Sequence, residues 1–137
     1  LLGDIIMTRL FYPAIFHPEK VGYSVSVPDL SGCFTQGDTL DEAYEMAFDA
    51  IGLCVEDLLE NKEKLPKPSL PKNVFHTPDD FVVLVNFSLA DYYKKHNSKS
   101  VKKTLTIPSW LNAAAEEQHI NFSSTLQSAL KKQLNME

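Results

Sequence analysis

The chain lacks several features that would assign it to a specialised class of protein. Its 137 residues contain no run of about 18 apolar residues, so neither a membrane-spanning helix nor a membrane partner is expected. Its two cysteines, Cys33 and Cys54, form no CxxC pair; one disulfide is compatible with them, but a reduced, cytoplasmic protein is favoured. The four histidines lie far apart and match no zinc spacing, so neither a metal nor another cofactor is predicted.

What is present is the composition of a folded domain. Hydrophobic residues make up 44% and charged residues 23% of the chain, as in ordinary globular proteins. Leu1–Leu10 lacks a basic segment followed by a long apolar core, so we expect no secretory signal. We interpret Met7 as a candidate start, which leaves Leu1–Ile6 outside the predicted fold.

Charge divides the chain into two parts. The net charge is −5, but residues 99–137 carry five lysines against three glutamates, a balance of +2. The other eight basic and fifteen acidic residues, all within residues 1–98, give −7. A mildly basic tail on an acidic body indicates two modules with different partners. We predict a first domain over residues 7–90, a linker over 91–100 and a second domain over 101–137.

The first part of the chain predicts three short strands. Leu10–Phe16 is apolar and aromatic, and its Pro13, which lacks an N–H group, is expected at an edge or a bulge. Tyr23–Val27 alternates apolar and polar residues, the pattern of a half-buried strand. Cys33–Gln36 is the third strand. Turn residues separate the three, so they form a meander.

A long helix and a further strand complete the first domain. Thr39–Glu42 has the pattern of a capping box, and apolar residues then recur at helical spacing until a predicted end near Lys64. Asp80–Ser88 is nearly continuous in apolar residues, which predicts a strand buried on both faces inside the sheet. The first domain is therefore expected to be an α+β fold with the order β-β-β-α-β.

The second domain has a different pattern. Lys102–Ile107 predicts one strand, and Pro108 suits the first position of the helix that follows, over Trp110–His119. Ser123 is a good N-cap for a second helix over Ser124–Leu134. This strand–helix–helix unit is too small to bury a core by itself, and a lone strand leaves both of its edges open.

Pairing with the same strand of a second copy solves both problems. We therefore infer an obligate homodimer, from which higher oligomers can form. Strand alternation places Lys102, Thr104 and Thr106 on the face away from the helices. The opposite face and the helices supply the predicted dimer core, which consists of Leu105, Ile107, Trp110, Leu126 and Leu130.

The segment KKTLTIP, followed by two short helices, resembles the ribbon-helix-helix family of DNA-binding domains. In that family a two-stranded ribbon enters the major groove, and the N-terminus of the second helix holds a phosphate. The resemblance implies that Lys102, Thr104 and Thr106 read the bases of operator double-stranded DNA. It also implies that Ser123 and Ser124 bind a phosphate of the DNA backbone.

The run YSVSVPDLSGCFTQGDTLDEA, residues 23–43, is similar to the signature of HicB antitoxins. This resemblance covers nearly everything from Met7 on, and it implies a partial RNase H-like domain followed by a ribbon-helix-helix domain. It implies that the first domain blocks the active site of a HicA-type, mRNA-cleaving toxin, while the second represses the operon at its operator. The toxin contacts expected from it are Tyr23, Pro28, Asp29, Leu30, Gly32, Phe34 and Asp38.

An enzymatic role for the first domain is one alternative. RNase H chemistry uses two metal ions held by several carboxylates, one of them in the first strand, but Leu10–Phe16 contains no acid. The remaining acids fall at strand ends, in loops and on an exposed helix face, so no catalytic residue and no enzyme activity are predicted. A metal-dependent RNase H-like nuclease and a small-molecule-responsive transcriptional repressor stay open as rival functions.

Overall fold

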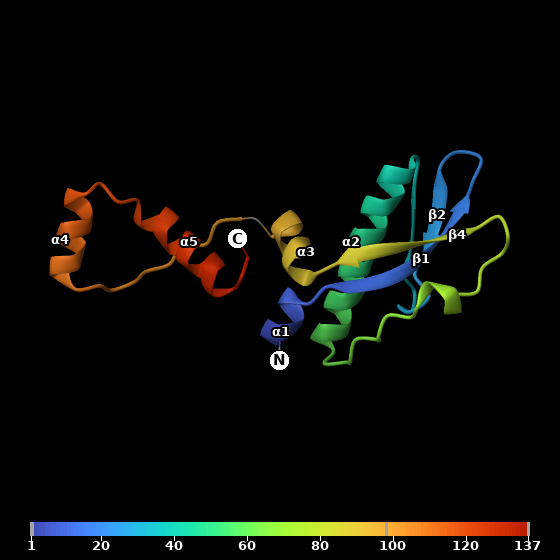
Figure 1. Ribbon diagram of the computed structural model, residues 1–137, viewed down its shortest axis with the longest axis horizontal. Coiled ribbons are helices and arrows are strands. Elements are labelled where there is room, and N and C mark those ends of the chain that lie inside the picture. The colour runs from blue at the N-terminus through green and yellow to red at the C-terminus, as the bar shows by residue number, and fades with distance from the viewer. Residues whose placement is uncertain (1, 98, 137) are drawn as a thin grey trace. The chain divides into compact units, whose positions relative to one another are not determined.

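The computed structural model describes residues 2–97 and 99–136, and the chain separates into two compact units between residues 98 and 99 (Figure 1). This boundary lies inside the linker predicted over 91–100. Ser98 of the predicted linker and Glu137 of the predicted second domain lie outside the described residues, as does Leu1. No helix within the described ranges is long and apolar enough to cross a membrane.

The first unit is built on a four-stranded antiparallel sheet (Figure 1). Its strands are β1 (Leu10–Pro18), β2 (Tyr23–Ser26), β3 (Phe34–Gly37) and β4 (Phe81–Phe87), in the spatial order β3-β2-β1-β4. A long helix, α2 (Leu40–Glu60), and a proline-rich loop connect β3 to β4. The predicted element order β-β-β-α-β is confirmed, and the unit is a mixed α+β fold.

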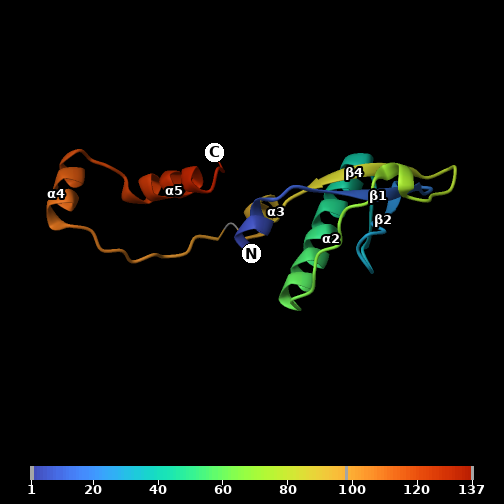
Figure 2. The ribbon, with the colours of Figure 1, turned by 60° about the horizontal axis from the view of Figure 1, so that its bottom comes forward.

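One face of the sheet carries the core. Tyr12, Ala14 and Phe16 of β1 are fully buried there, and the strand register sets Tyr12 beside Val85 and Phe16 beside Val25. The helix α2 crosses the same face, as the two views show (Figures 1 and 2), and buries a stripe of small and branched side chains. These are Ala43, Ala47, Ile51 and Val55, at the spacing expected of an amphipathic helix.

Local sequence determines both ends of α2. The Thr39 hydroxyl accepts a hydrogen bond from the Glu42 N–H at 3.1 Å, as the capping box predicts. Directly before it, Gly37 lies so close to the helix that a Cβ there would stand 2.3 Å from the Ala43 nitrogen. The helix ends at Glu60, earlier than predicted, and Lys62 then adopts the left-handed region with φ of 55°.

The strand β4 differs from the prediction of a strand buried on both faces. It lies at the edge of the sheet, where Val85 and Phe87 are buried but the alternate residue Leu84 is 43% exposed. The prediction is wrong on both counts, because β4 is an edge strand and because α2 covers only the face that carries Val85 and Phe87. The Tyr44 hydroxyl of α2 accepts the Asn86 N–H at 3.1 Å in place of a neighbouring strand.

Pro13 lies at a local edge of the sheet, as the sequence predicts, although its strand is not an outer one. It belongs to β1, which is an inner strand. The pairing of β2 with β1 begins only at Ile15, so beside Pro13 there is no β2 ladder to interrupt. The short length of β2 therefore accommodates the missing N–H group.

The helix α3 (Leu89–His96) occupies most of the predicted linker. It begins after Ser88, whose hydroxyl accepts the Asp91 N–H at 3.2 Å, and it buries Leu89 and Tyr92. The prediction of a linker is therefore wrong for residues 91–96, which belong to a helix of the first unit. The segment packs against the first unit through a few buried apolar side chains, and its Lys95 and His96 also contact Asp49 of α2.

A short helix at the start of the chain, α1 (Leu2–Met7), also belongs to the first unit. It contacts α3, and its Ile5 and Ile6 pack against the core cluster. Beyond it, the Arg9 guanidinium forms an ion pair with Asp91 of α3. The interpretation that left Leu1–Ile6 outside the fold is therefore wrong for these two isoleucines.

The second unit contains the two helices that the sequence predicts, α4 (Ser109–Glu117) and α5 (Phe122–Gln133). The cap of α5 is Asn121 and not Ser123, because the Asn121 side-chain oxygen accepts the Ser124 N–H at 2.9 Å. Asparagine caps a helix as well as serine does, and here it starts the helix earlier. Neither helix has a buried side chain.

The described chain forms no strand over Lys102–Ile107, where the sequence predicts one. The whole segment is exposed and leads to Pro108, which is the N-cap of α4 and not its first residue. A strand needs a second strand for its backbone hydrogen bonds, and a single chain supplies none here. Pairing with another copy therefore stays a prediction.

Candidate functional site

The run Tyr23–Asp38, which holds the predicted toxin contacts, folds as β2, a tight turn and β3. Within the turn, the Val27 N–H donates to the Cys33 carbonyl at 3.0 Å, and the Cys33 N–H donates to the Leu30 carbonyl at 3.2 Å. Gly32 has φ of +73°, a conformation that other residues rarely adopt. Much of the run therefore serves to close the turn itself.

Asp29 connects this turn to the proline-rich loop through hydrogen bonds. Its carboxylate accepts two hydrogen bonds from Ser69, one from the N–H at 2.8 Å and one from the hydroxyl at 2.6 Å. Nearby, the Tyr12 hydroxyl donates to the Pro66 carbonyl at 2.6 Å. Burial, together with the charge of Asp29, raises the pKa of Tyr12 to about 12, so this hydroxyl keeps its proton at neutral pH.

The predicted toxin contacts thus divide into inward and outward residues. Leu30 is only 2% exposed, and the Tyr23 ring packs against Phe16 and Phe81 at centroid distances of 6.1 and 5.8 Å. By contrast, Phe34 on β3 is 74% exposed although it is a large aromatic residue. The exposed members of the predicted set are Pro28, Gly32, Phe34 and Asp38.

The predicted DNA contacts lie in the second unit and are all exposed. Lys102, Thr104 and Thr106 belong to the segment before α4. At the start of α5, an open polar hollow of about 350 Å³ is lined by Asn121, Ser123, Ser124, Gln127, Ser128 and Lys131. The hollow brings Ser123 and Ser124 together with Lys131, which the sequence analysis did not include. Hydroxyls, an ammonium group and a helix N-terminus are groups that suit an anion.

The second unit also exposes its apolar side chains. Leu126 of the predicted dimer core is half-buried, while Leu105, Ile107, Trp110 and Leu130 are 59%, 43%, 71% and 52% exposed. Leu134, which shares a face of α5 with Leu126 and Leu130, is also exposed. Sequence reasoning missed four further exposed apolar residues of this unit, which are Val101, Leu111, Ile120 and Phe122. Exposed apolar side chains in such number are typical of protein–protein interaction surfaces.

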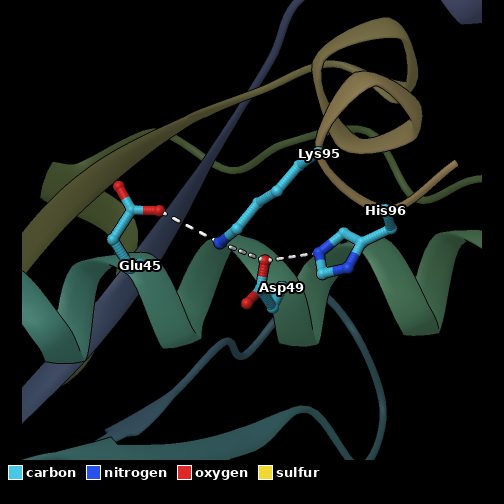
Figure 3. Close-up of polar contacts among 4 residues, drawn as sticks. All are labelled: Glu45, Asp49, Lys95 and His96. Carbon is cyan, nitrogen blue, oxygen red and sulfur yellow. Dashed lines mark hydrogen bonds and ion pairs between the residues drawn. The ribbon is translucent and has the colours of Figure 1, made fainter. Parts of the chain in front are cut away.

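A polar cluster between α2 and α3 was not anticipated from the sequence. The Lys95 ammonium donates to Asp49 at 2.8 Å and to Glu45 at 3.2 Å, and His96 Nε2 lies 2.9 Å from Asp49 (Figure 3). Burial alone would raise the pKa of Asp49, but hydrogen bonds from Lys95 and His96 outweigh it and lower that pKa. The spacing of Glu45 and Asp49 on one helix face was the available signal.

The metal site of the rival nuclease function can be compared with the carboxylates that the structure describes. Within the described ranges, no group of three or more His, Cys, Asp or Glu residues could hold a metal ion. A two-metal nuclease needs several convergent carboxylates, and Asp29 is already bonded to Ser69. Burial beside Cys54 raises the pKa of Cys33 to about 12, which makes its thiol a poor nucleophile.

Sequence comparison finds antitoxins. Residues 12–130 match the family model described as "HicB_like antitoxin of bacterial toxin-antitoxin system". A 14.9 kDa protein of Haemophilus phage HP1 is 38% identical over 105 residues, which cover 74% of this chain and 76% of that protein. Antitoxin HicB 1 of Photorhabdus laumondii is 45% identical over 64 residues, 46% of this chain and 41% of that antitoxin. The chain thus spans less than half the length of this last relative.

Structural comparison gives the same class. A chain of a toxin–antitoxin complex from Streptococcus pneumoniae matches with a TM-score of 0.55 and 28% identity, covering 92% of this chain and 99% of that one. The shared fold and the family match, which runs through both units, define an antitoxin of a bacterial toxin–antitoxin system. The chain belongs to the HicB-like family of these antitoxins.

Proposed function

We propose that this antitoxin covers the active site of a cognate HicA-type toxin with its first unit and represses its own operon with its second. The observation that carries the proposal is the family match over residues 12–130, which includes both units. The likeness to a chain of a solved toxin–antitoxin complex supports a protein toxin as the partner.

Toxin binding belongs to the first unit in this proposal. Phe34 is the main candidate anchor, because exposed aromatic residues contribute strongly to interfaces when a partner covers them. Pro28, Gly32 and Asp38 are exposed in the same run and extend the contact. An interface of standard size, about 1,600 Å² in total, is large enough to hide a small active site. Inhibition is then steric and needs no catalytic residue of the antitoxin.

Operator binding belongs to the second unit and requires a dimer. Two copies of Lys102–Ile107 pair as a ribbon, which satisfies their backbone groups and covers the apolar helix faces. The exposed side chains then read bases, with Lys102, Thr104 and Thr106 in the major groove. The polar hollow at Ser123 and Ser124 takes a phosphate of the DNA backbone.

Co-expression tests the antitoxin role. We expect the full chain to restore growth of cells that express the small protein from the adjacent reading frame, and to co-purify with that protein. Phe34→Lys should weaken the complex by about 2 kcal/mol, as loss of an interface anchor does. Phe75→Lys is the matched control, because Phe75 is 89% exposed but lies outside the run. Absence of both rescue and co-purification by the unaltered chain would show that the proposal is wrong.

Operator binding is tested by mobility shift with DNA from the chain's own promoter. Thr104→Ala and Thr106→Ala should each cost about 1–3 kcal/mol and relax sequence specificity. Lys102→Ala acts on a base or on the DNA backbone. Thr77→Ala, an exposed threonine of the first unit, is the control and should leave affinity unchanged. Intact binding by all three variants of the second unit would refute the assigned strand register.

A further inference from the structure

The helix α2 carries an unusual concentration of negative charge. Its 21 residues include seven acids and no basic residue, and the acids are Asp41, Glu42, Glu45, Asp49, Glu56, Asp57 and Glu60. One side of the helix is buried against the sheet, and another is covered by α3. The remaining, third side keeps Glu42, Asp57 and Glu60 exposed, and α3 reaches its border, where Lys95 and His96 bind Asp49.

Two large apolar residues interrupt the acids on this third side. Met46 is 41% exposed and Leu53 is 64% exposed. A spacing of seven residues places them two turns apart on one face. Glu42 lies one turn before Met46, and Asp57 and Glu60 lie one and two turns after Leu53, so acids border the apolar pair at both ends. We call Glu42, Met46, Leu53, Asp57 and Glu60 the acidic stripe.

The contact of α3 with α2 shows what kind of group these acids bind. Lys95 reaches Glu45 and Asp49 while its ammonium stands 5.9 Å from the centre of the Phe48 ring, and His96 adds a second nitrogen at Asp49 (Figure 3). On the side of α2 next to the exposed acids, the group that binds carboxylates is therefore the basic end of a helix, and it lies beside the apolar Phe48. Among the residues that the structure describes, no cation forms an ion pair with Glu42 or Glu60.

We propose that the acidic stripe is a docking surface for a basic amphipathic segment of the toxin. This inference rests on the proposed function, and it adds a second contact surface to the exposed residues of Tyr23–Asp38. Met46 and Leu53 supply the apolar area that a partner removes from water. The carboxylates at both ends attract lysines or arginines of the partner, which speeds association and disfavours acidic partners.

The charge of the stripe argues against two other occupants. A second copy of this chain would bring the same acids face to face, and like charges in an interface cost free energy. Nucleic acid carries a dense negative charge and would be repelled by the same carboxylates. A basic protein surface is the occupant that fits both the apolar pair and its acidic borders.

The test is a titration of the full chain with the small protein from the adjacent reading frame. Met46→Lys combined with Leu53→Lys should weaken binding at least about tenfold, because it removes the anchors and reverses local charge. The matched control combines Val21→Lys with Leu84→Lys, residues 71% and 43% exposed on other elements of the same unit. The control should bind as tightly as the unaltered chain.

A conservative pair of substitutions guards against loss of the fold. Glu42→Gln with Glu60→Gln keeps the shape of the helix surface, and should slow association and flatten its dependence on salt. Equal affinity and equal association rate for both stripe variants and the unaltered chain would overturn this inference and leave the proposed function standing. No binding by the unaltered chain would instead overturn the proposed function, and the stripe inference with it.

Discussion

The two units of this antitoxin use their apolar residues in opposite ways. All buried apolar side chains in the described chain, from Tyr12 to Tyr92, lie in the first unit, and most are 0–5% exposed. In the second unit Trp110 is 71% exposed and Leu105 59%, and neither helix buries a residue. The first unit therefore has a buried core of its own. The second unit has apolar side chains but, within the described chain, nothing that buries them.

The exposure of its apolar residues suggests that the second unit does not fold as a single copy. Thirty-nine residues are too few to enclose a core, and the extended segment before α4 leaves its backbone groups without a neighbouring strand. In the proposed dimer, a second copy would pair with the segment Lys102–Ile107 and cover the exposed apolar side chains of the helices. The stability of the second unit should therefore depend on protein concentration, while that of the first should not.

The strongest way to break this comparison is to disrupt the proposed ribbon. Leu105→Asp with Ile107→Asp places two charges in the predicted dimer core, which should cost more than about 3 kcal/mol and abolish dimerisation. Sedimentation velocity should report a monomer, and operator binding should be lost. The single tryptophan, Trp110, should keep a solvent-exposed emission maximum at every concentration.

The control for this experiment changes apolar residues of the first unit. Leu70→Asp with Phe75→Asp alters side chains that are 57% and 89% exposed, so the dimer should survive. A dimer that persists in the Leu105→Asp, Ile107→Asp chain, with a buried Trp110, would show that the strand does not join the two copies.

Local patterns made most of the first unit predictable. The alternation in Tyr23–Val27, the capping box at Thr39 and the helical spacing after it each depend on near neighbours, and each matches the structure. The helix α3 was missed because its burial depends on a distant residue. Tyr92 fits against α2 only because Gly52 leaves room for the ring, a relation that no local pattern contains.

The candidate site was less predictable because resemblance does not separate folding from contact. Asp29 was expected at the toxin interface, yet its carboxylate holds Ser69 of a loop 40 residues away. Leu30 and Gly32 close the turn in the same run. Phe34 keeps its predicted place as a contact candidate because a side chain 74% exposed has no comparable internal role.

A smaller effect is expected at the contact between Gly52 of α2 and Tyr92 of α3, which tests how closely these two helices pack in the first unit. A Cβ at Gly52 would stand 2.1 Å from the Tyr92 ring, so Gly52→Ala should cost about 1–3 kcal/mol and loosen α3. Urea unfolding measures the cost, and hydrogen exchange of residues 89–96 measures the loosening. In a Tyr92→Ala background the clash is gone, and the same change should stabilise α2 by roughly 0.5–1 kcal/mol. Equal effects in both backgrounds would contradict the packing account.

A pH experiment addresses the polar cluster that holds α3 on α2. The pKa of Asp49 is lowered from 3.8, so its stabilising contribution is present above that value and is lost as pH falls through the folded-state pKa. The partners Lys95 and His96 are 40% and 38% exposed, so the contribution should be below about 1 kcal/mol. Asp49→Asn should remove this part of the acid dependence in urea unfolding. Asp41→Asn, which changes one charge elsewhere on the helix, should not.

The smallest expected effect concerns the opposite end of the sheet, where His17 of β1 pairs with Asp80 before β4. The hydrogen bond with Asp80 raises the pKa of His17 above 6.5, so the pair stabilises the fold below that pH and loses its effect as pH rises through the folded-state pKa. An NMR titration should give a His17 midpoint above 6.5. Asp80→Asn should lower the midpoint clearly and Asp79→Asn less, because Asp79 acts only through its charge. Equal shifts of the His17 midpoint in the two variants would show that nearby negative charge, and not the hydrogen bond with Asp80, raises the pKa of His17.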